Sequence, residues 1–182
     1  MALSATIFKA DLTVTDMDRG YYATHALVLA RHPSETDERM MVRLLAYALN
    51  AGGALAFGKG LSSEDEPDLW EKDFTGAIQS WIEVGLPDEK SVRKACGRAA
   101  QVRIYTYGRG AGRWWQDVQT ALSRPDNLTV TELPQAATRA MAALAQRTMQ
   151  LQCTVQDGTV WLTDGANTIE IALLLLGAAR KA

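Results

Sequence analysis

Residues 66–90, EPDLWEKDFTGAIQSWIEVGLPDEK, contain two acidic residues in surroundings that predict extended structure. Asp68 follows a proline and begins a short extended piece. Glu83 lies inside the apolar run AIQSWIEVG, which breaks at Gly85 and Pro87. Burial of a carboxylate costs several kcal/mol of free energy unless a cation or hydrogen bonds compensate for it. Asp68 and Glu83 are therefore candidate ligands of a metal ion.

The segments around this stretch predict an alternating α/β core. Apolar spacing gives the order helix, strand, strand, strand, helix, strand across the middle of the chain. In sequence order these are a helix opened by Pro33 and Ser34 and ended by NAGG, strands at ALAFGKG, PDLW and AIQSWIEVG, a helix from Pro87-Asp88, and a strand at QVRIYTY. Ser34 and Asp37 have the spacing of a capping box. The first helix has an apolar stripe of Met41, Val42, Leu45 and Leu49, and the second has a stripe of Val92, Ala95, Cys96 and Ala99.

Both ends of the chain predict β-hairpins. Residues 8–15 alternate apolar and polar side chains, and YYATHALVLA returns after the turn TDMDRG. Near the other end, Gln156-Asp157-Gly158 is a strong hairpin turn between TMQLQCTV and TVWLT, and NTIEIALLLL completes a meander. A helix around GRWWQDVQTALS, a strand at NLTVTEL and a helix from Pro134 to about Arg147 precede this meander. No repeat or linker divides the sequence, so residues 1–182 are expected to form a single domain.

The composition is that of a globular protein without a membrane segment. Of 182 residues, 47% are apolar and 22% are charged. This balance argues against disorder. The longest apolar run, IALLLLGAA, is too short to span a bilayer, and the N-terminus has no signal-peptide pattern. We therefore expect a cytoplasmic protein. Cys96 and Cys153 are far apart and outside any CxxC motif, which favours two free buried thiols over a disulfide or a zinc site.

Carboxylates are the only candidate metal ligands that the chain offers in quantity. The two histidines, His25 and His32, are too few for a histidine-rich site, so a hard cation such as Mg²⁺ is favoured. Glu38 shares the helix side of Met41 and Val42, three and four positions later, which makes it a third candidate. The alternative for Glu38 is a first-turn carboxylate that faces the helix dipole and still contacts water.

The charges form two adjoining blocks. Residues 64–89 contain the acids Glu64, Asp65, Glu66, Asp68, Glu71, Asp73, Glu83, Asp88 and Glu89 and one base, Lys72. Residues 90–113 contain the bases Lys90, Arg93, Lys94, Arg98, Arg103, Arg109 and Arg113 and no acid. Such blocks can be a cation site beside a phosphate-binding surface, or two solvated faces that neutralise each other. Trp114 and Trp115 can likewise be core residues or a base-stacking platform.

LARHPSETDERMMVRLLAYAL, EDEPDLW, WIEVGLPDEK and RKAC resemble segments of the YaeQ family of bacterial proteins, and the resemblance covers essentially the whole chain. That family is similar in fold to the PD-(D/E)xK restriction-endonuclease-like superfamily. The resemblance implies an α/β fold with a three-layer α/β/α core and a mixed sheet, to which N-terminal and C-terminal β-hairpins are added. The superfamily pattern maps onto Pro67-Asp68, onto Glu83-Val84-Gly85 in place of Glu-x-Lys, and onto Glu38 as the helix carboxylate.

The sequence departs from this pattern at Gly85, which stands where a lysine is expected. Some relatives of the superfamily carry this lysine on the following helix, where Lys94 and Lys90 are the candidates. Helical spacing does not choose between them, since both lie away from the stripe of Val92. The family motif favours Lys94. Gly85 can vacate space for that lysine, or it can simply let the strand turn.

These expectations combine into three hypotheses about function. In the first, Glu38, Asp68 and Glu83 bind Mg²⁺, Lys94 or Lys90 assists a water molecule, and the protein hydrolyses nucleic-acid phosphodiesters. In the second, the fold has lost the reaction and binds nucleic acid or a protein. Under either of these hypotheses, the protein binds its partner through a basic surface formed by Lys90, Arg93, Lys94 and Arg98. The missing lysine and an acidic pI of about 5.7 favour the second hypothesis, and an adaptor without nucleic acid is a third.

Overall fold

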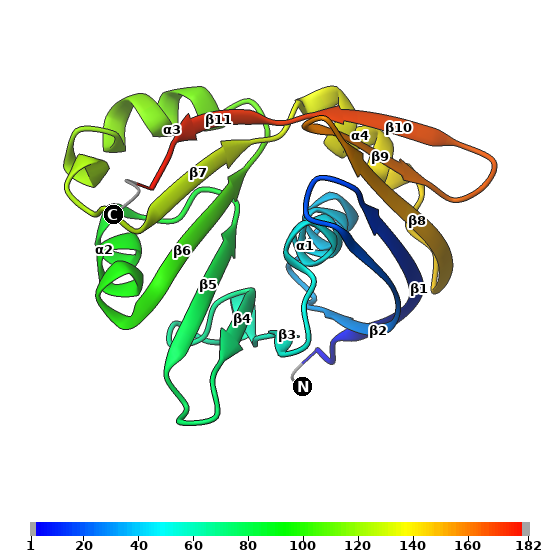
Figure 1. Cartoon of the computed structure of the whole chain (residues 1–182), viewed down its shortest axis with the longest axis horizontal. Helices are drawn as coiled ribbons and strands as arrows, with labels where there is room; N and C mark the ends of the chain where they lie inside the picture. Colours follow the sequence, from blue (N-terminus) through cyan, green and yellow to red (C-terminus); the bar gives the residue numbers. More distant parts are fainter. Residues whose placement is uncertain (1–2, 180–182) are drawn as a thin grey trace. The chain divides into compact units, whose positions relative to one another are not determined.

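The computed structural model describes residues 3–179, which form four α-helices and two mixed β-sheets (Figure 1). The chain divides into two compact units. Unit 1 consists of Met1–Ala51 and Pro134–Leu173, and unit 2 consists of Gly52–Leu133 and Leu174–Ala182. Each unit is described by itself below. The mixed α/β class expected from the sequence is confirmed, and the single domain stays a prediction.

Unit 1 contains a five-stranded sheet with the order β10-β9-β8-β1-β2. Its strands are β1 (Thr6–Asp16), β2 (Tyr21–Arg31), β8 (Thr148–Gln156), β9 (Thr159–Thr163) and β10 (Thr168–Ala172). Only the central β1–β8 pair is parallel. Both predicted hairpins, β1–β2 and β8–β9, are confirmed. Asp157 and Gly158 both have positive φ angles, as expected for the two central residues of a tight hairpin turn.

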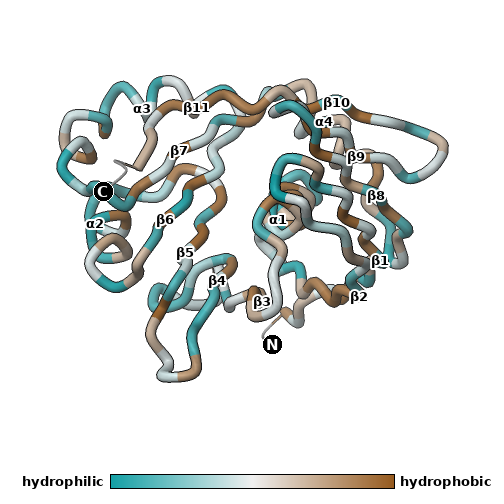
Figure 2. The backbone as a smooth tube through the Cα atoms, viewed as in Figure 1, coloured by the Kyte–Doolittle hydropathy of each residue, from teal (hydrophilic) through white to brown (hydrophobic). Residues whose placement is uncertain are grey.

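The alternation of the strands determines which face of this sheet is buried. Phe8, Ala10, Leu12 and Val14 are buried, while their neighbours are exposed or half-buried. Figure 2 shows hydrophobic and hydrophilic colours alternating along β1 and β8. Helices α1 (Asp37–Asn50) and α4 (Gln135–Ala143) pack against each other and on the sheet (Figure 1). In the predicted stripe, Met41, Val42 and Leu45 are fully buried, and Leu49 is half-buried.

Both helices of unit 1 have boundaries that differ from the sequence predictions. The N-cap of α1 is Thr36, whose side chain accepts a hydrogen bond from Arg39 N at 3.1 Å, so the predicted capping box of Ser34 and Asp37 is wrong. Ser34 instead bonds the ring of His32 at 2.6 Å, in a turn that precedes the helix. Helix α4 ends four residues before Arg147, because the next two N–H groups make tighter i→i−3 bonds.

Unit 2 contains a six-stranded sheet with the order β11-β7-β6-β5-β4-β3. Its strands are β3 (Leu55–Phe57), β4 (Leu69–Lys72), β5 (Ile78–Val84), β6 (Ala99–Thr106), β7 (Leu128–Glu132) and β11 (Leu174–Gly177). The pairs β5–β6 and β6–β7 are parallel, and the others are antiparallel. The predicted order of α1, β3, β4, β5, α2 and β6 along the chain is confirmed.

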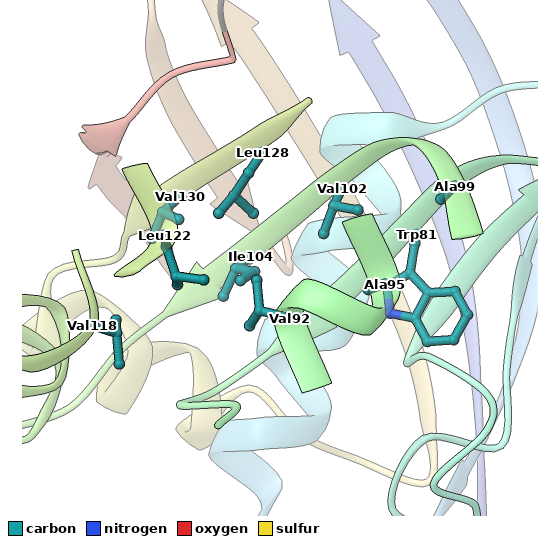
Figure 3. Close-up of a cluster of buried hydrophobic side chains, with 10 residues drawn as sticks. All are labelled: Trp81, Val92, Ala95, Ala99, Val102, Ile104, Val118, Leu122, Leu128 and Val130. Carbon is teal, nitrogen blue, oxygen red and sulfur yellow. The ribbon is translucent and has the colours of Figure 1, made fainter. Parts of the chain in front are cut away.

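The helices of unit 2 cover one face of this sheet. They are α2 (Glu89–Arg98) and α3 (Ala111–Val118), with the short 3-10 helices η1 (Gly60–Ser62) and η2 (Ala121–Ser123). Side chains from α2, α3, η2 and the strands form the buried cluster of Figure 3, which consists of Trp81, Val92, Ala95, Ala99, Val102, Ile104, Val118, Leu122, Leu128 and Val130. Trp114 and Trp115 are half-buried and pack against this cluster, which supports a packing role for both. The three-layer arrangement of the restriction-endonuclease-like fold stays a prediction.

Strand β11 corrects one prediction. The sequence predicts that NTIEIALLLL completes one meander, but only β10 pairs with β9, whereas β11 pairs antiparallel with β7 in the sheet of unit 2. Hydrophobic burial explains the switch, because Leu176 packs against the cluster of unit 2. At Gly177 a Cβ atom would lie 2.9 Å from Cη2 of Trp115. A glycine is therefore needed for this close approach.

Candidate functional site

Asp68 lies at the start of β4 in unit 2 and is fully buried. Leu69 pairs with Ile82 in the antiparallel β4–β5 ladder, so Asp68 and Glu83 occupy the next position of the register. The Asp68 Oδ2 atom accepts a hydrogen bond from the main-chain N–H of Val84 at 2.8 Å. The Asp68 carboxylate is therefore directed toward β5, beside the residue that follows Glu83.

A glycine loop encloses Asp68 on its other side. Gly58 N donates to Asp68 O at 2.9 Å, and Gly60 N donates to Pro67 O at 3.2 Å. A Cβ atom at Gly58 would lie 2.2 Å from Pro67 O, and one at Gly60 would lie 2.7 Å from Asp68 Oδ1. Gly60 also has a positive φ. The sequence analysis missed this cradle, although two glycines spaced two residues apart are a signal of close backbone approach.

Glu83 lies on the face of β5 that also carries Trp81, as the alternation predicts. Its side chain is half-buried. The Oε1 atom of Glu83 accepts a hydrogen bond from the indole Nε1–H of Trp81 at 2.8 Å. Asp68 and Glu83 are therefore both held by donors of β5, one from the main chain and one from a side chain.

Glu38 belongs to unit 1 and lies half-buried in the first turn of α1. Its Oε1 atom accepts a hydrogen bond of 2.7 Å from the hydroxyl of Thr138, a fully buried residue of α4. This hydroxyl offsets part of the desolvation cost that the sequence analysis attributes to Glu38. Sequence patterns could not reveal Thr138, because it lies one hundred residues away along the chain.

The structure brings together two of the three predicted metal ligands. Asp68 and Glu83 are neighbours in unit 2, whereas Glu38 lies in unit 1, so a site made of all three carboxylates stays a prediction. Within residues 3–179, no group of three or more His, Cys, Asp or Glu side chains has an arrangement that could hold a metal ion. The two-carboxylate pair of unit 2 is therefore the firmest part of the candidate site.

The two candidate lysines are both exposed on α2. Lys94 Nζ forms an ion pair with Asp65 Oδ1 at 2.9 Å, and Arg98 donates to the Asp65 carbonyl at 3.4 Å. The hydrogen bond and charge of Lys94 lower the pKa of the Asp65 carboxyl. Lys90 lies in the first turn of α2 and points away from the buried side of Val92. The acidic loop thus neutralises part of the basic block, as one of the two interpretations of the charge pattern predicts.

The backbone conformation at Gly85 explains why a glycine is found at this position. Its φ of +107° lies in a region that other residues rarely adopt, because a Cβ atom strains that conformation. Its N–H donates to Tyr105 O at 2.9 Å. Among the described residues, no atom lies within 4 Å of the position that a Cβ would take. The glycine therefore allows the strand to turn, and its second role, to vacate space for a lysine of α2, stays a prediction.

The four cations Lys90, Arg93, Lys94 and Arg98 are all exposed on α2, and we refer to them as the basic face. Arg93 pairs with Glu89 one turn earlier at 2.9 Å. The guanidinium of Arg98 lies 5.2 Å from the ring centroid of Trp81, within the range of a cation–π interaction.

Neither cysteine contributes a reactive thiol, because burial raises the pKa of Cys96 to about 11 and that of Cys153 to about 12. Both are free, as predicted, but only Cys153 is buried, whereas Cys96 is half-buried.

Known proteins share this mixed α/β fold over nearly the whole chain. A family model described as "YaeQ protein" matches residues 1–173. The chain belongs to the YaeQ family. The structure is similar to the crystal structure of the YaeQ protein from Xanthomonas axonopodis pv. citri, with a TM-score of 0.93 and 48% identity over 96% of this chain and 99% of that one. It is also similar to that of the YaeQ protein from Pseudomonas syringae, with a TM-score of 0.93 and 38% identity over 97% and 98%.

Two curated relatives extend over nearly the same length. The uncharacterised protein YaeQ of Salmonella typhi is 48% identical, and that of Escherichia coli (strain K12) is 47% identical, each over 95% of this chain and 96% of the relative. These names assign no activity, substrate or cofactor. Of the helices in the described part of the chain, none is long and apolar enough to cross a membrane.

Proposed function

We propose that this protein is a Mg²⁺-dependent nuclease-type enzyme that hydrolyses nucleic-acid phosphodiesters at a variant PD-(D/E)xK site. Asp68 and Glu83, which both belong to unit 2, form this site. One observation carries the proposal: Asp68 is fully buried, and its Oδ2 atom is bonded to the main chain beside Glu83 at 2.8 Å. A buried carboxylate next to a second one is stabilised by hydrogen bonds or by a compensating charge, and a divalent cation can supply that charge.

The oxygen atoms that this site offers as metal ligands fit magnesium. Carboxylate oxygens are the hard ligands that Mg²⁺ prefers, and the ion usually keeps several water ligands of its own. When bound, Mg²⁺ supplies charge stabilisation and an activated water molecule to phosphoryl chemistry. The roles of the protein are to orient Asp68 and Glu83 and to bring the phosphodiester backbone to them. The basic face of α2 is suited to the second role, since lysine and arginine neutralise phosphates.

A lysine of α2 completes the proposed enzyme. Lys94 can serve only when it leaves Asp65, and the ion pair is exposed on both sides, with side-chain exposures of 54% and 77%. Exposed ion pairs are weak, so a phosphate can displace Asp65 at little cost. Lys90 is the second candidate. Either ammonium group would stabilise the charge that develops on the phosphate in the transition state.

A second function is favoured by a different observation. Gly85 stands in the place of the motif lysine, and Lys94 is engaged by Asp65. Both features fit a nuclease-fold protein that has lost catalysis and binds nucleic acid through the basic face. Such binding should weaken steeply with salt, because each phosphate contact releases counterions. Binding without hydrolysis separates this function from the enzyme.

Two measurements on the purified protein test the proposal. Calorimetric titration with MgCl₂ and MnCl₂ should show binding by the parent and by Glu170→Gln, an exposed carboxylate of β10 that serves as the control. Glu83→Gln should bind neither ion. Cleavage of a mixed panel of single- and double-stranded DNA and RNA is then followed with and without Mg²⁺ for the parent, Lys94→Ala and Lys90→Ala. A parent that binds metal and nucleic acid but cuts nothing overturns the enzyme and leaves the binding protein.

A further inference from the structure

Trp81 contacts both parts of the proposed site. It lies in β5 with 4% of its surface exposed and belongs to the buried cluster that also contains Val92 and Ala95 of α2 (Figure 3). Its indole Nε1–H donates to Glu83 Oε1 at 2.8 Å. The guanidinium of Arg98 lies 5.2 Å from its ring centroid. One side chain therefore contacts a proposed metal ligand and a cation of the basic face.

The packing of Trp81 fixes the direction of its N–H group. Trp70 lies edge-on to it, with ring centroids 6.2 Å apart and an interplanar angle of 83°. A tryptophan has only two side-chain torsions, and close packing in the cluster holds both. Residues i and i+2 of a strand point to the same face, so the fixed indole lies beside the Glu83 side chain.

We propose that Trp81 is a positioning residue for the metal site, which orients Glu83 through its indole N–H and links that carboxylate to the nucleic-acid contact at Arg98. This inference rests on the proposed function. Outer partners that orient metal-binding side chains typically contribute about 10- to 100-fold to metal affinity. Trp81→Phe removes the N–H donor and retains an aromatic ring, so it should weaken Mn²⁺ binding by roughly this factor.

The matched control is Trp70→Phe. Trp70 is a neighbour of Trp81 across the β4–β5 ladder and packs against the same cluster. Its replacement by phenylalanine alters the edge contact with Trp81 but retains an aromatic ring and leaves the N–H donor of Trp81 in place. A general loss of packing should therefore affect both variants equally, whereas loss of positioning should affect only Trp81→Phe.

Mn²⁺ is the probe, and its affinity is measured by calorimetric titration of the folded parent, Trp81→Phe and Trp70→Phe. We expect Trp81→Phe to bind at least about tenfold more weakly and Trp70→Phe to stay within about threefold of the parent. If Trp81→Phe matches the parent, or if the two variants weaken equally, the inference is overturned while the metal site stands. If the parent itself binds no Mn²⁺, both the proposed metal site and this inference are wrong.

A second readout keeps the inference testable if Trp81→Phe does not fold. In ¹⁵N-labelled parent protein, Mg²⁺ should shift the indole N–H resonance of Trp81, because its acceptor becomes a metal ligand. The indole of Trp114 is the internal reference, since it donates to Pro87 O at 2.8 Å, away from the carboxylates. The tryptophan signals can be assigned by single Trp→Phe replacements elsewhere. A Trp81 resonance that stays unmoved at saturating Mg²⁺ overturns the inference.

Discussion

Replacement of Arg43 by methionine should destabilise unit 1 strongly. Arg43 lies on α1, and its guanidinium forms a two-pronged pair with Glu35, through Nε to Oε1 at 2.7 Å and through Nη2 to Oε2 at 2.8 Å. Nη2 also donates to Ala30 O at 3.1 Å. The Arg43 and Glu35 side chains are only 7% and 2% exposed. Methionine retains most of the aliphatic stem but leaves Glu35 without this partner.

The magnitude follows from these contacts. Hydrogen bonds to charged groups contribute about 1.5–3 kcal/mol each, and removal of one member of a buried ion pair costs about 3–5 kcal/mol. Arg39 still donates to Glu35 Oε1 at 3.0 Å, so the lower end of this range applies. We expect a loss of about 3 kcal/mol. For a chain of 150–250 residues, 1 kcal/mol corresponds to roughly 2–4 °C, which predicts a fall of about 6–12 °C in the melting temperature.

Thermal unfolding followed by circular dichroism measures this fall. The control is Arg113→Met, which breaks an exposed pair with Asp117 at 3.9 Å and should change the melting temperature little. The double variant Glu35→Leu/Arg43→Met removes both charges and should recover much of the loss, because it leaves no buried carboxylate without its partner. A fall below about 2 °C for Arg43→Met, or a double variant less stable than the single one, would refute the reasoning.

Three further changes test features of unit 2. Gly60→Ala should destabilise the fold by about 1–3 kcal/mol in chemical denaturation, because it places a side chain on a left-handed backbone. The new Cβ would also lie 2.7 Å from Asp68 Oδ1. Unchanged stability would contradict the close approach of the glycine loop to Asp68. Asp65→Asn frees Lys94 and should therefore raise the affinity for a fluorescent DNA oligonucleotide at low salt, by less than about tenfold. A loss of affinity would exclude competition between Asp65 and phosphate for Lys94. Asp88→Ala removes the N-cap of α2 and should cost about 1 kcal/mol at pH 7. The cap's own hydrogen bonds lower the pKa of Asp88, so this difference is present above the ordinary value of 3.8 and should disappear as the pH falls below it. A difference that grows in acid would contradict the assignment.

Local patterns in the sequence predict most of the individual elements but not their long-range partners. The alternation of β1 and the turn at Asp157 follow from residues a few positions apart, and the structure confirms them. The predicted stripe of α2 is confirmed in part, since Val92 and Ala95 are buried, Cys96 is half-buried and Ala99 belongs to β6. The partner of β11 is different, because a short apolar strand can pair with any open sheet edge, and the burial of Leu176 decides which. A local contact also explains why the predicted helix cap is wrong, since the Ser34 hydroxyl forms a hydrogen bond with His32 instead of capping α1.

For the candidate site too, the sequence predicts local features but not long-range contacts. Pro67-Asp68 and Glu83 were identified from an apolar context, and the ladder places them in adjacent register because both belong to one short hairpin. The donors that orient the carboxylates were not predicted. Thr138 reaches Glu38 from a distant helix, and the N–H of Val84 reaches Asp68 only once the register is set. Such contacts depend on tertiary structure, which local periodicity does not encode.

The interleaving of the two units along the chain has a consequence for synthesis on the ribosome. Residues 1–51 emerge first, but β1 must wait for β8 before its parallel edge is paired, and the whole of 52–133 is made in between. At about 5–20 residues per second, the β1 edge stays open for several seconds. Unit 2 in turn lacks its last strand until residues 174–177 leave the exit tunnel. The nascent protein therefore exposes two unpaired strand edges late in translation, when they are open to aggregation or chaperone capture.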